Sequence, residues 1–445
     1  MARFLVTCWP FVGHLYPQVS VAHALRARGH EVAFYSHESA RPVVEGQGFR
    51  FFPFVRVDQG RFERIHELEA QVPSTQAMRR TLAVAMRAYR DMLADAIPEQ
   101  IADLKPVVDA WRPDVVVTDP AMWSSILVLW ELTGIPVVLL SQMIGSLIPG
   151  PDAPPWGPGL RPPRTFGTRL LARATQIGVD VVAHGLRRHV DRIRARYGLR
   201  PMGCSVNAFT GRLPLYLIPS VPELDYNRRD QPPNVHYIGP CVWTNPGVAS
   251  LEWLDKLPVD RPWVHATEGT AQYQEPFLLR AAAQGLAGQR LEVIMTTGQM
   301  SRDPAALGLR NLPPNVHVAR WVSHEDLLPR CAAIVTTGGA ATVLASLKAG
   351  VPLVVVPTFW DKNDNAQRVV EAGVGIRLAP RHCTPDRLRA AVMRLLEEPA
   401  FRENARRMAR RIAEVPGPRR AAELLEKLAH ESPARAATAA RAATA

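Results

Sequence analysis

The stretch RWVSHEDLLPRCAAIVTTGGAATVLASLKAGVPLVVVPTFWDKNDNA, residues 320 to 366, decides the fold of this chain. It predicts a strand, a glycine turn, a helix and a second strand, in the order Ala333–Thr336, Gly338–Gly339, Thr342–Ala349 and Leu353–Val356. The second strand is apolar at every position, which is typical of a parallel strand buried on both faces. The stretch therefore predicts one unit of an open α/β sheet.

The glycine turn is a candidate phosphate site. Gly338 and Gly339 precede a helix, and the free N–H groups at the positive end of a helix dipole bind anions. Upstream, Trp321 offers an aromatic face on which a nucleobase can stack. Asp361 and Lys362 follow the second strand at its carboxyl end, where open α/β sheets bind their ligands.

The length of 445 residues predicts two domains of about 200 residues each. We expect the first over residues 1–225 and the second over residues 226–430, because the segment 219–262 is rich in proline and polar residues. Residues 431–445 are rich in alanine, threonine and arginine and have nothing to bury, so we expect a disordered tail.

Both halves alternate strands with helices, which predicts parallel sheets with right-handed crossovers. In the first half, Trp9–Tyr16 is expected as a loop after the first strand, with Pro17 opening a helix. Residues 60–105 are expected to be helical, and the last helices are expected to return to the first domain. The predicted strands are Phe4–Cys8, Glu31–Tyr35, Asp114–Thr118, Val137–Ser141 and Leu215–Ile218, then Trp263–Thr267, Leu291–Thr297, Val316–Ala319, Ala333–Thr336, Leu353–Val356 and Gly375–Leu378.

The stretch that decides the fold resembles the donor-binding signature of family-one, GT-B-type glycosyltransferases. That signature runs Trp, His-Gly-Gly-x-Gly-Thr, Gly-Val-Pro and Pro-x-x-x-Asp-Gln-x-x-Asn-Ala. The chain has the same elements in the same order, at Trp321, Thr337–Thr342, Gly350–Pro352 and Pro357–Ala366. It departs from the signature at Thr337, Ala341 and Lys362, where the family has His, Gly and Gln. The resemblance implies an α/β fold of two Rossmann-like domains facing a cleft, and transfer of a sugar from a nucleotide.

The resemblance assigns the donor residues. Trp321 is expected to stack on the base while the backbone of Val322 pairs with its edge. Asp361 is expected to accept hydrogen bonds from sugar hydroxyls, and Thr337 offers a hydroxyl where the family has imidazole. The residues expected around the diphosphate are Gly338, Gly339 and Thr342, with Gly269 and Thr270 in a second loop beneath it.

Two donor-side residues leave questions open. Glu268 would repel a diphosphate, so we expect its carboxylate to point away. Lys362 either pairs with Asp361 or Asp364 on the surface or reaches into the donor pocket, where its charge favours an anionic or deoxygenated sugar. The second placement is preferred, because Thr337 and Lys362 depart from the family together.

His14 is the candidate general base. The run Val12-Gly13-His14-Leu15-Tyr16-Pro17 resembles the Gly-His-x-x-Pro motif, in which the histidine deprotonates the acceptor, and Gly13 is expected on the donor side. Asp119 ends a strand at the same sheet edge, so it is expected to orient the imidazole, with a helix cap as the alternative. Asp114 lies at the other end of that strand and is excluded.

The segment from Pro149 to Pro163 contains seven prolines, so it is expected to be an extended surface loop. It is either a linker or part of the acceptor wall. In the second case, the apolar residues near it would contact a lipophilic acceptor: Met143, Ile144, Leu147, Ile148 and Trp156.

The composition excludes several other classes. The net charge of +12 is scattered, which disfavours nucleic acid and suits an anionic nucleotide sugar. The five cysteines show no CxxC spacing, so no zinc site or disulfide frame is expected, and a reducing cytoplasm fits. We expect neither a signal peptide nor a transmembrane segment. No G-x-G-x-x-G follows the first strand, which disfavours a dinucleotide-dependent oxidoreductase.

The resemblance therefore implies an inverting, metal-independent glycosyltransferase that moves a sugar from a UDP- or dTDP-linked donor, and the apolar residues near the proline-rich segment favour a lipophilic small-molecule acceptor. No cofactor is expected besides the nucleotide sugar, which is a co-substrate. The alternatives are a nucleotide-sugar epimerase of the same fold and a catalytically silent partner protein. The sugar, the acceptor, the O-, N- or C-linkage and a possible homodimer stay open.

Overall fold

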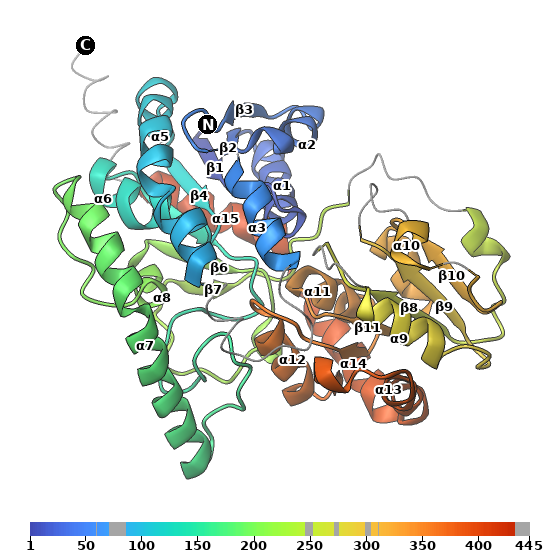
Figure 1. The fold of residues 1–445 in the computed structure, drawn as a ribbon. Coiled ribbons are helices and arrows are strands. Elements are labelled where there is room, and N and C mark those ends of the chain that lie inside the picture. The colour runs from blue at the N-terminus through green and yellow to red at the C-terminus, as the bar shows by residue number, and fades with distance from the viewer. Residues whose placement is uncertain are drawn as a thin grey trace.

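The computed structural model describes residues 1–58, 60–70, 86–244, 252–270, 276–298, 304–309 and 311–431. Two parallel sheets stand side by side, each with helices packed against it (Figure 1). The predicted tail falls outside these ranges except for Glu431, which ends the last helix.

All strand pairs of the first sheet are parallel, in the order β3-β2-β1-β4-β5-β6-β7. Its strands are β1 (Arg3–Thr7), β2 (Glu31–Ser36), β3 (Arg50–Pro53), β4 (Val115–Thr118), β5 (Val137–Leu140), β6 (Leu215–Ile218) and β7 (Val235–Tyr237). Neighbouring residues of β1 enter different cores: Leu5 packs with Val116 on one face, and Phe4 and Val6 pack on the other. Burial on both faces explains the continuous apolar runs.

The first sheet extends further than the sequence indicated. The edge strands β3 and β7 were not predicted, and β7 pairs with β6 through Tyr216 and Val235. The boundary expected between residues 225 and 226 is therefore too early, because the first sheet ends only at Tyr237.

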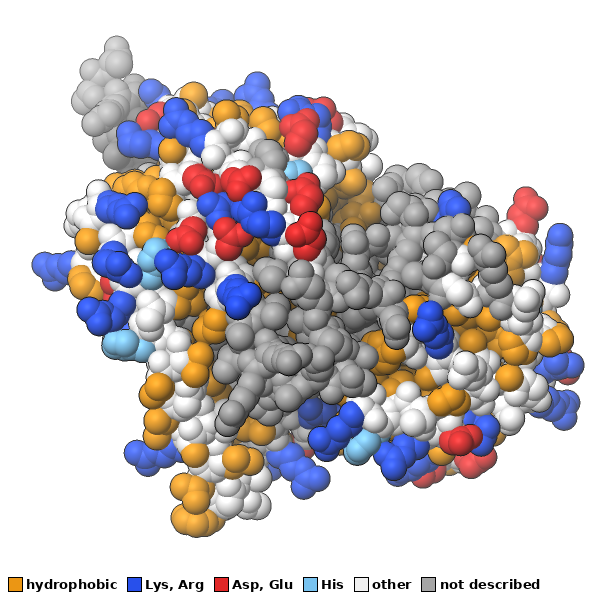
Figure 2. Space-filling model, in the orientation of Figure 1, with side chains coloured by type: hydrophobic (Ala, Val, Ile, Leu, Met, Phe, Trp, Pro, Cys, Tyr) orange, Lys and Arg blue, Asp and Glu red, His pale blue; other side chains and the backbone are white. Residues whose placement is uncertain are grey.

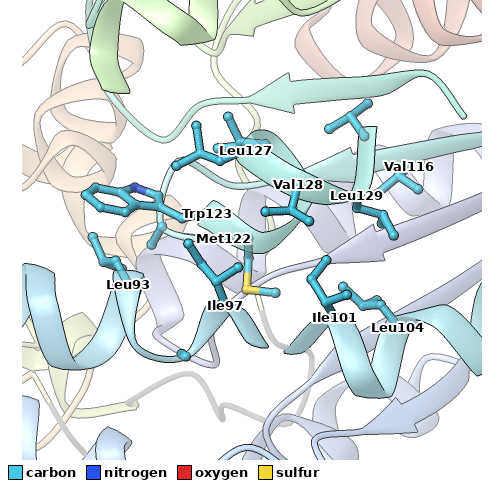
Figure 3. Close-up of a cluster of buried hydrophobic side chains, with 14 of the residues drawn as sticks. Leu93, Ile97, Ile101, Leu104, Val116, Met122, Trp123, Leu127, Val128 and Leu129 are labelled. Atoms are coloured by element: carbon cyan, nitrogen blue, oxygen red, sulfur yellow. The ribbon is translucent and has the colours of Figure 1, made fainter. Parts of the chain in front are cut away.

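Helices of the first domain cover both faces of this sheet. They are α1 (Val12–Ala27), α2 (Arg41–Gly46), α3 (Gly60–Ala70), α5 (Ile97–Trp111), α6 (Trp130–Thr133), α7 (Phe166–Ala195) and α8 (Val206–Phe209), with π-helical turns at Tyr89–Ala94 and Ser125–Leu129. Figure 3 shows one of the cores, in which Ile97, Ile101 and Leu104 of α5 face Met122 and Val128 across the interior. Within the predicted helical segment 60–105, residues 71–85 lie outside the described ranges.

The second sheet is also parallel, in the order β10-β9-β8-β11-β12-β13. Its strands are β8 (Trp263–Thr267), β9 (Glu292–Thr296), β10 (Val316–Ala319), β11 (Cys331–Thr336), β12 (Leu353–Val355) and β13 (Gly375–Arg377). Its helices are α9 (Phe277–Gly285), α10 (His324–Leu327), α11 (Ala340–Lys348), α12 (Lys362–Glu371), α13 (Pro385–Glu397) and α14 (Pro399–Ala413).

The last helix, α15 (Gly417–Glu431), returns to the first domain, as predicted. It lies among the elements of that domain, next to α1 and β4 (Figure 1). Ala421, Ala422 and Leu425 are buried in a core of the first sheet, and Glu426 bonds to His30 and Arg28 at the end of α1.

Helix α7 projects from the first domain (Figure 1). Apolar side chains lie exposed along it, as Figure 2 shows, among them Phe166, Leu170, Ile177 and Val181. Some residues of α7, including Val182 and Leu186, line a cleft between the domains. No helix in the described ranges combines the length and apolar character that a membrane span requires.

Candidate active site

A cleft of about 1470 Å³ lies between the two sheets and is lined by residues of both domains. The carboxyl ends of β1, β4 and β5 open into it from one side, through His14, Pro120 and Gln142. Those of β8 and β11 open into it from the other side, through Gly269 and Gly339. Facing carboxyl ends are where ligands bind in open α/β sheets.

The structure brings His14 and Asp119 together. His14 Nδ1 lies 3.0 Å from Asp119 Oδ2, with the carboxylate fully buried and the imidazole partly open to the cleft. Asp119 also accepts hydrogen bonds from the backbone N–H groups of Trp9, at 3.1 Å, and Ala121, at 2.7 Å. These bonds fix the carboxylate before any ligand binds. The bond to Ala121 closes the turn after β4. The role of Asp119 in orienting the imidazole stays a prediction.

His14 lies in the first turn of α1 rather than in the predicted loop, because α1 begins at Val12 and contains Pro17. A proline inside a helix removes one hydrogen bond to the residue four positions before it, here Gly13. Leu15, Val19 and Leu25 are buried against the sheet, and this apolar burial offsets the loss. Gly13 lines the cleft beside His14.

The N-terminus of α11 faces the cleft from the second domain. Gly339 is its N-cap residue, and Ala340, Ala341 and Thr342 of its first turn line the cleft. The first N–H groups of a helix have no partner within the helix, and they carry the positive end of its dipole. This is the geometry of an anion seat. The helix begins two residues before the predicted start at Thr342.

Gly338 itself does not line the cleft. Its φ of +88° is in the left-handed region, and a Cβ there would lie 2.5 Å from Val355 Cγ1. Its carbonyl accepts a 2.9 Å hydrogen bond from Asn365 Nδ2, which also donates to Asp361 Oδ2 at 2.7 Å. Gly338 therefore shapes the turn that presents Gly339, and its expected contact with the diphosphate stays a prediction.

Trp321 and Val322 follow β10 and line the same cleft, on the side of the Gly269 loop. His324, which the sequence analysis did not select, lines it beside them. Burial lowers the pKa of His324 to about 4, so its imidazole is neutral at neutral pH. The only feature of the sequence that pointed to His324 as a cleft residue was its closeness to Trp321.

The C-terminal part of the chain, residues 286–428, matches the model of the erythromycin biosynthesis protein CIII-like C-terminal domain. The whole chain is similar to 4'-demethylrebeccamycin synthase of Lentzea aerocolonigenes, with 35% identity over 411 residues, 92% of this chain and 94% of the relative. This chain is a natural-product glycosyltransferase. Demethyllactenocin mycarosyltransferase of Streptomyces fradiae is 26% identical over 432 residues, covering 96% of this chain and 87% of that protein.

Solved structures confirm the predicted GT-B fold of this glycosyltransferase. CalG4, the calicheamicin glycosyltransferase, superposes with a TM-score of 0.68 at 25% identity, covering 97% of this chain and 99% of that one. The spinosyn rhamnosyltransferase SpnG, complexed with thymidine diphosphate, has a TM-score of 0.66 at 21% identity, with coverage of 96% and 99%.

The donor loops of the glycosyltransferase are bonded to one another. The Thr337 hydroxyl donates to the Glu268 carbonyl at 3.0 Å, which joins the turn after β11 to the loop after β8. The Glu268 carboxylate turns away, as expected, and accepts the backbone N–H of Leu278 at 2.9 Å, at the start of α9. Gly269 has a φ of +71° and lines the cleft together with Thr270.

Lys362 lies in the cleft rather than on the surface, with 8% of the residue exposed. Its Nζ donates to Thr358 Oγ1 at 3.3 Å and lies 4.7 Å from the centre of the Phe359 ring. Asp361, just before it, is half-buried, and desolvation raises the pKa of its carboxyl, an effect opposed by the Asn365 bond and the Lys362 charge.

Four residues that were expected in the acceptor wall line the cleft, namely Met143, Leu147, Ile148 and Trp156. Ile144 does not: it is fully buried in a core with Val322 and other residues of the second domain, so its assignment to the acceptor wall is corrected. Residue alternation along an irregular loop cannot be read from sequence.

Aromatic residues that the sequence analysis did not select complete this wall. Tyr89 is stacked on Trp123 at 6.1 Å with an interplanar angle of 10°. Trp360, from the second domain, meets the edge of Tyr89 at 5.5 Å. Trp360 has a φ of +58°, a conformation that is strained for an aromatic residue, and its ring packs against a core of the first domain.

Gln142 was also missed, although it touches the candidate base. Its Nε2 lies 2.9 Å from His14 Nδ1 and 3.0 Å from His14 Nε2. Gln142 follows β5, the strand next to β4, just as Asp119 follows β4. The rule that selected Asp119, a polar residue at the carboxyl end of a buried strand, would have selected Gln142 as well.

In the described part of the chain, no group of His, Cys, Asp and Glu side chains is suited to hold a metal ion.

Proposed function

We propose that this glycosyltransferase moves a sugar from a UDP- or dTDP-linked donor to a lipophilic small-molecule acceptor, with inversion at the anomeric carbon. The observation that carries the proposal is the pair of His14 and Asp119, 3.0 Å apart, in the same cleft as the N-terminus of α11. One side of the cleft thus holds a base for the acceptor, and the other holds a seat for the diphosphate.

His14 takes the proton. Because a carboxylate only accepts hydrogen bonds, Asp119 keeps the ring proton on Nδ1 and leaves the Nε2 lone pair facing the acceptor. Histidine is the side chain that most often serves as a general base in enzymes. The Gln142 amide nitrogen lies within 3.0 Å of both ring nitrogens, so this side chain must move aside before an acceptor reaches Nε2.

The transfer is a single displacement. The acceptor gives its proton to His14 Nε2, and its freed electron pair forms the new bond to the anomeric carbon. The bond from that carbon to the diphosphate oxygen breaks, and its electrons leave with the nucleoside diphosphate. The N–H groups at the start of α11 stabilise the charge of the leaving group. Attack from the side opposite the leaving group inverts the anomeric centre.

Trp321 stacks the base, Asp361 accepts hydrogen bonds from the sugar, and the nucleotide sugar is the only co-substrate. The thymidine diphosphate bound to SpnG supports a dTDP-linked donor, and the names of the relatives support a natural-product acceptor. The aromatic wall of Tyr89, Trp123 and Trp360 supports an acceptor with a large apolar surface.

The test is incubation of the protein with several UDP- and dTDP-sugars and a panel of aromatic and macrocyclic aglycones, followed by mass spectrometry. We expect a product heavier by one sugar residue, the opposite anomeric configuration by NMR, and unchanged turnover after chelation of metals. An epimerised donor without glycoside would favour the epimerase. Retention of the anomeric configuration would rule out a single displacement. Nucleotide binding without any conversion of the donor would favour the catalytically silent partner protein.

A further inference from the structure

The proline-rich loop of the first domain is held by a carboxylate of the second. Asp364, in the first turn of α12, accepts the backbone N–H of Gly157 on Oδ2, at 2.5 Å, and that of Gly159 on Oδ1, at 2.8 Å. Only 3% of Asp364 is exposed. Hydrogen bonds to an ionised carboxylate are shorter and stronger than those between neutral groups.

Neighbouring groups close the loop on α12 from the other side. Arg377 donates to the Gly159 carbonyl at 2.6 Å and to Asn363 Oδ1 at 3.2 Å. Gly159 has a φ of +63°, and a Cβ there would collide with the backbone carbonyl of Asn363. The loop backbone therefore lies directly on the first turn of α12, with both its N–H and C=O groups bonded to the second domain.

The two ends of this contact reach different parts of the cleft. Trp156, which lines the acceptor side, directly precedes Gly157. Asp361 and Lys362, on the donor side, lie one turn of α12 or less before Asp364. We propose that Asp364 is a positioning residue that fixes the acceptor wall to the donor-binding helix. The inference rests on the proposed function, because it assumes that Trp156 contacts the acceptor.

A separate contact holds the two domains together. Arg368, one turn further along α12, forms a 2.8 Å ion pair with Asp225, which is fully buried. This pair lies outside the loop and does not depend on Gly157 or Gly159. Loss of the Asp364 bonds should therefore release the loop while leaving the domains in place.

The charge state of Asp364 adds a pH dependence to its hold on the loop. Burial raises the pKa of its carboxyl to about 6, although Arg368 and the N–H groups of Gly157 and Gly159 oppose the shift. Below that pH the carboxyl gains a proton, and the oxygen that carries it is a poorer acceptor. Other titratable or charged groups around Asp364 are Asp361, Arg368, Arg377, Tyr89 and Tyr226.

The variant Asp364→Asn tests the inference, since an amide keeps the shape but accepts only one of the two N–H groups. We expect the acceptor KM to rise about tenfold, while kcat and the dissociation constant of the nucleoside diphosphate stay within about threefold. The acceptor KM of the wild type should also rise below about pH 6, and this rise should be absent in the variant. Asp386→Asn, on an exposed carboxylate in the first turn of α13, is the matched control.

Hydrogen exchange of a peptide spanning residues 154–161 reads the contact without any turnover. The amides of Gly157 and Gly159 should exchange faster in Asp364→Asn and in Arg377→Gln, and as slowly as the wild type in Asp386→Asn. Unchanged exchange would overturn the contact itself, even if transfer is seen. Faster exchange with an unchanged acceptor KM would overturn the positioning role. Faster exchange in a protein that transfers no sugar would instead remove the proposed function on which the inference rests.

Discussion

The two sides of the cleft that we propose for the donor and for the acceptor are built in opposite ways. On the donor side, loops of one domain bond to one another: Thr337 joins the Gly269 loop, and Asn365 joins the glycine turn to Asp361. On the acceptor side, an irregular proline-rich loop is bonded through Asp364 to the other domain. The donor seat is therefore formed within a single domain, whereas the acceptor wall requires both.

This contrast indicates which side of the cleft tolerates amino-acid substitutions. A seat for a nucleoside diphosphate must match one fixed chemistry, so its geometry is held by short local bonds. An acceptor wall whose outline comes from loops and aromatic side chains can change without disturbing the sheet. Substitutions on the donor side should alter nucleotide affinity, and those on the acceptor side should alter turnover or the acceptor KM.

The largest effect is expected at His14. His14→Ala should lower the transfer rate by about 10²–10⁴-fold, because it removes the general base, and should leave nucleotide affinity within about threefold. Single-turnover rates and calorimetry measure the two quantities. His382→Ala, at an exposed histidine, is the control. Turnover within about tenfold of the wild type would mean that another group takes the proton.

Trp321→Ala should give the largest effect on the donor side. Loss of base stacking should weaken nucleotide binding by about 1–3 kcal/mol, the range known for stacking of bases on aromatic residues. Acceptor binding should barely change. Calorimetry with dTDP and UDP measures the loss, and Trp253→Ala, at a tryptophan that packs beside His317, controls for the removal of an indole. Equal affinities in wild type and Trp321→Ala would remove this residue from the base site.

A smaller effect is expected at Thr337, whose hydroxyl joins the two donor loops. Thr337→Val keeps the shape and removes the bond to the Glu268 carbonyl, so nucleotide binding should weaken by about 0.5–1.5 kcal/mol. Thr337→Ser keeps the hydroxyl and should bind as the wild type does. If both variants bind equally well, the donor loops do not depend on this bond.

The smallest change in overall rate is expected at Lys362. Because its ammonium group lies in the cleft near Phe359, Lys362→Gln should alter the ranking of donor sugars more than the rate. Competition between several nucleotide sugars measures the ranking. Lys348→Gln, at a half-exposed lysine of α11, is the control. A ranking that both variants share with the wild type would leave Lys362 without a part in sugar selection.

Central strands were the most predictable part of the fold. The ranges Leu215–Ile218 and Trp263–Thr267 agree with the structure, because strands buried on both faces are apolar throughout. The edge strands β3 and β7 were missed: one ends in Pro53, and the other is the short, partly exposed Val-His-Tyr run. Partial burial weakens the apolar pattern of an edge strand without always hiding it, because the edge strand β10 was predicted with its observed bounds, Val316–Ala319.

Site residues also divide into those that a local sequence pattern reveals and those that it does not. His14 and the donor residues belong to short motifs, and Asp119 ends a buried strand, so the sequence alone singled them out as candidates. Asp364 joins Gly157 across 207 positions of sequence, and nothing near either residue reveals the other. Tyr89 and Trp123 meet only once the sheet is folded. Such contacts depend on tertiary structure, and a single sequence does not contain them in local form.

The return of α15 to the first domain has a consequence for synthesis on the ribosome. Ala421, Ala422, Leu425 and Ala429 fill a core whose other members, such as Phe4 and Val19, emerge first from the exit tunnel. That core stays uncovered on one face until α15 has been translated. The nascent first domain therefore exposes apolar side chains until α15 is made, more than 150 residues after its last strand, β7. A ribosome that stalls in the second domain would leave that surface open to chaperones or to other nascent chains.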